Sequence, residues 1–150
     1  MNRRQVFATS GAALATTLLT RSVSAAQESH DHHHNNKDHF EQCAEACAAC
    51  ANECGSCHNH CATLATAGSK DHIATMRICN DCQLVCSTAA ALATRKGPLS
   101  VEQCKACLKA CEECAAACGR FPDDAHMSLC AKRCRECAAA CKAMITAEEK

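Results

Sequence analysis

The chain has 150 residues, of which 18 are cysteine and only three are aromatic, and its formal net charge is zero. This length suggests one domain. The neutral charge and the scarcity of aromatic residues argue against a nucleic-acid-binding protein, which would carry a basic face. A cysteine content this high is typical either of a disulfide scaffold or of a metal-binding protein.

The first 26 residues have the pattern of a removable export signal. Arg3 and Arg4 form a charged start, residues 6–19 are mildly apolar but too short to span a bilayer, and small residues over 22–26 suit cleavage. An arginine pair before apolar residues predicts the twin-arginine route, with an ordinary secretory signal as the alternative. We therefore expect a protein of the periplasm or cell envelope, without a membrane segment after cleavage.

Residues 27–37 are polar and rich in histidine, which predicts a disordered arm. The histidines in and beside it could capture metal ions or could simply be solvated; they are His30, His32, His33, His34 and His39.

Four helices are expected between residues 38 and 147, because alanine is abundant and strand patterns are missing. Their expected ranges are 38–67, 70–96, 100–119 and 122–147. The short connections make consecutive helices antiparallel neighbours. The sequence therefore predicts an all-α fold, an antiparallel up-down-up-down four-helix bundle.

Capping patterns and helix breakers set these boundaries. Asp38 with Glu41 resembles a capping box for the first helix, and Ser100 with Gln103 a second one for the third. Gly68 and the pair at 97–98, glycine then proline, separate helices. A proline at 122 suits the first turn of the last helix.

The cysteines follow the helical period. Within each expected helix every interval between them is three or four residues, so each set lies on one face, the seam that meets the middle of a bundle. The eighteen candidates are Cys43, Cys47, Cys50, Cys54, Cys57, Cys61, Cys79, Cys82, Cys86, Cys104, Cys107, Cys111, Cys114, Cys118, Cys130, Cys134, Cys137 and Cys141.

Three interpretations of the seam compete. Cysteine could serve only as a small core residue, but after residue 26 the chain has just 13 Leu, Ile, Val and Phe, too few for an ordinary core. A disulfide framework is the second, although cysteines three or four apart on one helix are poorly placed for bridging. The third, which we favour, is a core that holds metal ions.

Charge indicates which metal. Eighteen buried thiolates could not remain uncompensated, and a monovalent ion at roughly one per thiolate would neutralise them. Cu(I) is soft and prefers thiolate and thioether ligands, so we expect several Cu(I) ions, on the order of ten or more. A zinc or cadmium thiolate buffer, iron–sulfur clusters and a disulfide-linked redox protein are the weaker alternatives.

Weaker, exchangeable accessory ligands gather where the first helix ends and the last begins. Thioether and imidazole groups there would suit a port through which copper enters. The candidates at this end are Met76, Met127, His72 and His126, with His58 and His60 as weaker ones. At the opposite end we expect an apolar plug of Phe40, Leu92 and Leu99, with Met144 continuing the seam.

The cysteine ladder over residues 38–147 resembles the bacterial copper storage proteins, a family of cysteine-lined four-helix bundles. The stretch 114–119 and the run from Cys130 to Cys141 look like the family's C-terminal half. The resemblance implies many Cu(I) ions per chain, homotetramers, a storage role without catalysis, and exchange of copper with a donor or acceptor protein.

Overall fold

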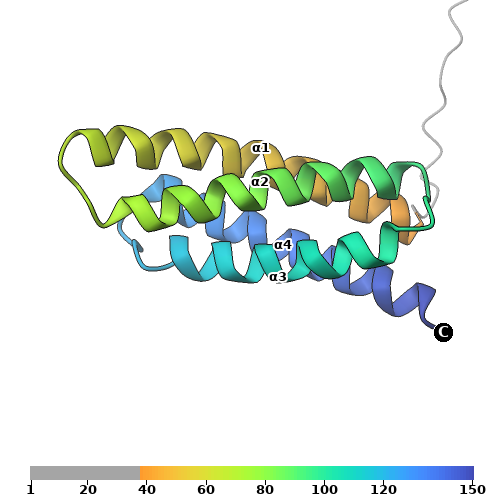
Figure 1. The fold of residues 1–150 in the computed structure, drawn as a ribbon. Helices are drawn as coiled ribbons and strands as arrows, with labels where there is room; N and C mark the ends of the chain where they lie inside the picture. Colours follow the sequence, from red (N-terminus) through yellow and green to blue (C-terminus); the bar gives the residue numbers. More distant parts are fainter. Residues whose placement is uncertain (1–37) are drawn as a thin grey trace, which may run out of the picture. The chain divides into compact units, whose positions relative to one another are not determined.

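The computed structural model describes residues 38–150, and this part of the chain forms four helices and no strand. They are α1 (His39–Thr66), α2 (His72–Thr94), α3 (Ser100–Cys118) and α4 (Ala125–Glu148). Each helix runs antiparallel to the next (Figure 1). The first and last helices, α1 and α4, also pack together, so the four helices form a closed ring. The all-α, up-down-up-down bundle is therefore confirmed. The expected signal peptide and histidine-rich arm lie outside the described residues.

Helix α1 begins and ends as its sequence predicts. The Asp38 carboxylate accepts a hydrogen bond from the backbone N–H of Glu41 at 2.9 Å, which satisfies a donor of the first turn. At the other end Gly68 has a φ of 105°, and the N–H of Ser69 reaches back to the carbonyl of Leu64 at 3.0 Å. This is a Schellman motif, which needs a left-handed residue and so favours glycine.

Helix α2 ends in the same motif, but its left-handed residue is a lysine. Lys96 has a φ of 50°, and the N–H of Gly97 bonds to the carbonyl of Leu92 at 3.2 Å. The break therefore falls one residue before the predicted glycine–proline pair, and α2 is shorter than expected at both ends. The Lys96 ammonium also pairs with the Asp38 carboxylate, which joins this turn to the start of α1.

The predicted openings of α3 and α4 are wrong in detail. Leu99 occupies the N-cap of α3 without a side-chain cap, and the Ser100 hydroxyl instead donates to the carbonyl of Leu92 at 3.0 Å. Pro122 lies before α4 rather than in its first turn. Asp124 caps α4, because its carboxylate accepts from the N–H groups of His126 and Met127.

The core consists mainly of sulfur and small residues. All the large fully buried apolar side chains of the described chain are cysteines and two methionines, Met127 and Met144. On α2 the seam passes from cysteine to Ala89 and Ala93, both 0% exposed. Helix α2 therefore contributes no thiol to the core near its C-terminal end. Hydrocarbon burial alone therefore stabilises this fold weakly.

The expected plug at the far end is only partly correct. Phe40 packs against the core and Met144 is 0% exposed, but Leu99 is 63% exposed. The reason is that Ser100 turns inward beside Leu92, leaving the preceding side chain to solvent.

Among the described helices, none combines the length and the apolar character needed to cross a membrane.

Candidate metal centre

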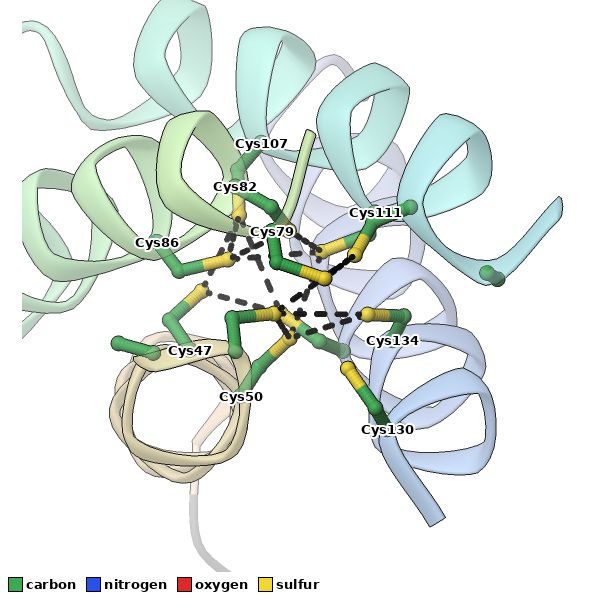
Figure 2. Packing of buried hydrophobic residues seen from close by; sticks show 14 of the residues in the cluster. Cys47, Cys50, Cys79, Cys82, Cys86, Cys107, Cys111, Cys130 and Cys134 are labelled. Atoms are coloured by element: carbon green, nitrogen blue, oxygen red, sulfur yellow. Dashed lines mark hydrogen bonds between the residues drawn. The ribbon is translucent and has the colours of Figure 1, made fainter. Parts of the chain in front are cut away.

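Every cysteine of the chain faces the bundle axis. All 18 are 0–1% exposed, and they come from all four helices. Figure 2 shows labelled cysteines of the four helices pointing toward one another across the middle of the bundle. The prediction that the seams meet inside is confirmed, and it follows from the spacing of three and four residues on each helix.

Sulfur atoms of different helices lie in contact, but none of the pairs is a disulfide. The hydrogen-bonded Sγ–Sγ distances run from 3.4 Å, between Cys43 and Cys104, to 3.9 Å, between Cys107 and Cys137. A disulfide bond would be about 2.05 Å long. All 18 cysteines are free thiols, so the disulfide framework is excluded as the basis of this fold.

The thiols also gather in groups of four whose sulfur atoms lie within 4.8 Å of one another. One group, for example, combines Cys57, Cys79, Cys118 and Cys130. No ordinary apolar core brings so many metal-ligating atoms together, and soft monovalent or divalent cations are the ions that such sulfur groups bind.

Ionisation of these thiols depends on their neighbours. Burial raises the pKa of the Cys61 thiol, because a thiolate there would lose water. In contrast, a hydrogen bond from Cys114 lowers the pKa of Cys118 to about 5, because the donor stabilises the thiolate. A thiolate at Cys118 would lie near the end where α1 and α3 finish.

We call this end of the bundle, with the α1–α2 and α3–α4 connections, the mouth; it lies at the left in Figure 1. Met127 is 0% exposed there, and its Sδ atom lies 3.5 Å from Sγ of Cys57 and 3.9 Å from Sγ of Cys61. The structure thus brings this predicted residue directly onto the outermost thiols.

Two histidines stack at the mouth. The rings of His60 and His126 are 4.6 Å apart and nearly parallel. His60 Nε2 lies 2.7 Å from the Asp124 carboxylate, while His126 Nε2 is directed toward the Ser56 hydroxyl at 3.2 Å. His126, a predicted ligand, therefore points along the outer surface of α1, and His60, given less weight from the sequence, holds the N-cap of α4.

The other two predicted accessory ligands lie on the first turns of α2. Met76 is partly buried against the sulfur core, and its carbonyl accepts a hydrogen bond from His58 Nδ1 at 3.0 Å. The His72 ring stacks on Phe121 at 4.3 Å. Its buried Nδ1 atom has no hydrogen-bond partner within the described chain.

Sequence reasoning missed two buried hydroxyls in the seam. Thr75 is 0% exposed and Ser100 is 1% exposed, each four residues before a cysteine. The Arg120 guanidinium donates to the Thr75 hydroxyl at 3.0 Å, which brings a positive charge to the mouth. Extending each cysteine ladder by one further step would have identified both residues.

Comparison with known proteins agrees with this geometry. The model of the copper storage protein family matches residues 36–146. The Cu(I)-bound copper storage protein BsCsp3 is 30% identical, with a TM-score of 0.66 over 72% of this chain and 99% of that chain. The Nmul_A1745 protein from Nitrosospira multiformis is 27% identical, with a TM-score of 0.62 over 73% and 96%. A search of curated proteins finds no match.

A helical bundle whose core is a column of free thiols is the architecture of a metal-binding protein. The chain belongs to the copper storage protein family. The resemblance found from the cysteine ladder is thereby confirmed, and copper storage is the function that this family carries.

Proposed function

We propose that this protein stores copper as many Cu(I) ions bound to thiolates inside the bundle. One observation carries the proposal: all 18 cysteines are buried, free and directed to one axis. Each ion that binds displaces thiol protons, and the resulting thiolates neutralise its charge, so neither a bare anion nor a bare cation remains in the core.

A variant that removes one central thiol tests the many-site store. Cys111→Ala should lower the Cu(I) capacity by about one or two ions and leave the rest, because neighbouring thiolates still supply ligands. The reciprocal variant Ala89→Cys adds a thiol to the bare part of the α2 seam and should raise capacity by about one ion. Titration of the reduced protein against a Cu(I) chelator measures both. Complete loss of copper from Cys111→Ala would contradict the proposal.

We infer that the ligands are the 18 cysteines together with Met76, Met127 and His72 at the mouth; His126, also expected from the sequence, would first have to turn away from Ser56. The support is strongest for Met127, whose sulfur touches Cys57 and Cys61. A thioether binds Cu(I) more weakly than a thiolate does, which suits a group that receives an ion and passes it inward. The buried, unpartnered Nδ1 of His72 supports a similar role.

The two buried methionines offer a matched test of this port. Met127→Leu preserves volume but removes the sulfur, so Cu(I) loading should slow several-fold while the final capacity stays nearly the same. Met144→Leu makes the same change at the opposite end, where Met144 is equally buried, and should load at the normal rate. Stopped-flow mixing with a coloured Cu(I) complex measures the rates; equal slowing by both variants would argue against a port at Met127.

We propose that storage involves no catalysis. A thiol–disulfide enzyme needs an exposed thiolate, often at a helix N-terminus, whereas each thiol here is 0–1% exposed. Copper would leave by exchange to an acceptor protein and arrive from a donor, both meeting the mouth.

We also propose that residues 1–26 are a twin-arginine signal, residues 27–37 an arm, and 38–147 the copper-binding part. Twin-arginine substrates are exported folded, so copper could be loaded before export. Replacing Arg3 and Arg4 by lysine should abolish export and leave the protein in the cytoplasm, as cell fractionation would detect. Unchanged export would favour the ordinary secretory route.

A homotetramer is the assembly we propose, on the strength of the family resemblance. Ile73 and Leu84 are 42% and 60% exposed. They are eleven residues apart on α2 and so project from the same side of the helix, where they supply apolar surface for contact between copies.

A further inference from the structure

The sulfur column that we propose to store copper also offers groups of four ligands to a divalent ion. Four thiolates around Zn²⁺ at about 2.3 Å form a tetrahedron whose edges, the S–S distances, are about 3.8 Å long. Groups of four sulfurs that the fold already holds near this spacing would bind such an ion with little rearrangement. Several four-sulfur groups lie in the core. Two of them, which share no residue, each have four S–S distances between 3.5 and 3.9 Å.

The first quartet combines one sulfur of α1, one of α3 and two from adjacent turns of α4. The Sγ atom of Cys47 lies 3.7 Å from that of Cys107, 3.6 Å from that of Cys137 and 3.6 Å from that of Cys141. Cys107 and Cys137 are 3.9 Å apart. All four atoms fall within 4.8 Å of one another, so the group surrounds one point on the bundle axis.

The second quartet lies beside it, between α1, α2 and α3. The Sγ atom of Cys111 is 3.8 Å from that of Cys50, 3.9 Å from that of Cys82 and 3.5 Å from that of Cys86. Cys82 and Cys86, one turn apart, are separated by 3.7 Å. Figure 2 labels all four of these cysteines, and their sulfurs converge from three helices.

We propose that these two quartets are tetrahedral sites for a divalent, closed-shell metal ion, with Zn²⁺ as the physiological candidate. The quartets have no ligand in common, so the two ions do not compete for a thiolate, although the Sγ atoms of Cys86 and Cys107 bring the two groups into contact at 3.5 Å. Each filled site keeps a charge of −2, because four thiolates outweigh one divalent cation. Cu(I) neutralises thiolates one for one, so it should displace Zn²⁺ from both quartets.

Co²⁺ is the probe, because tetrahedral thiolate coordination gives it intense visible and charge-transfer absorption. The reduced full chain, titrated without oxygen, should bind two Co²⁺ ions tightly, and Zn²⁺ should then bleach the spectrum. The double variant Cys107→Ser/Cys111→Ser removes one ligand from each quartet and should lose both tight sites.

The matched control is Cys104→Ser/Cys118→Ser, which removes two thiols from the same helix but none from either quartet. It should still bind two Co²⁺ ions, while Cu(I) capacity should fall equally in the two variants. Equal Co²⁺ loss in both variants, or no tetrahedral spectrum at all, would overturn the two zinc sites. A chain that binds Cu(I) but no Co²⁺ refutes these sites alone; one that binds Co²⁺ but no Cu(I) refutes copper storage alone.

Discussion

Loading with Cu(I) should raise the thermal midpoint of this bundle by tens of degrees. Its core contains few large apolar side chains, so metal bonds between helices should replace much of the missing hydrophobic stabilisation. Two independent sites filled at 100 times their Kd would already add about 5 kcal/mol. For a domain of this size that corresponds to roughly 20 °C in Tm. Circular dichroism of the reduced apoprotein and the loaded protein measures the shift.

Mg²⁺ provides the control for this experiment. It is a hard cation that prefers oxygen ligands and binds thiolates poorly, so it should leave the midpoint unchanged. If Cu(I) also left the midpoint unchanged, the ions would be bound on the outside of the bundle rather than between its helices.

The fold could be predicted from the sequence because two independent patterns agreed. Cysteines three and four residues apart fixed the inward face of each helix, and glycine-containing breaks fixed the number of helices. The local errors arose where tertiary contacts outweighed local chemistry. Ser100 lies in a sequence that predicts an N-cap, but its hydroxyl donates a hydrogen bond to the carbonyl of Leu92 instead. Lys96 occupies the left-handed position that a glycine usually fills.

The thiol column could be predicted for the same reason, whereas the mouth could be predicted only in part. Met127 lies one helical step before Cys130, so the ladder places it correctly against Cys57. His126 follows no such ladder, and its direction depends on Ser56 across the helix interface. Which sulfurs form quartets depends likewise on the relative rotation and height of four helices, which spacing along a single helix does not determine.

The second large effect concerns the apoprotein at alkaline pH. Hydrogen bonding with Cys114, followed by other thiols and burial, raises the pKa of Cys54 far above its ordinary value of 9.0. Contact with Cys107 raises the pKa of Cys111 in the same way. These thiols stay protonated in the folded chain at a pH where the unfolded chain has released its protons. Their contribution to stability is therefore complete below the unfolded pKa and decreases as the pH rises above it.

Three such thiols would lower the free energy of unfolding by about 4 kcal/mol for each pH unit above the unfolded thiol pKa, because each contributes about 1.36 kcal/mol per unit. Thiols with a lowered pKa, such as Cys118, are ionised in both states there and do not offset this loss. We expect the reduced apoprotein to unfold between about pH 9 and 10.5, above the ordinary thiol range. The Cu(I)-loaded protein should stay folded, because metal has already replaced the thiol protons. Anaerobic denaturant titrations of both forms at each pH measure this difference, and a parallel decline of the two would mean that exposed lysines, not the sulfur core, set the alkaline limit.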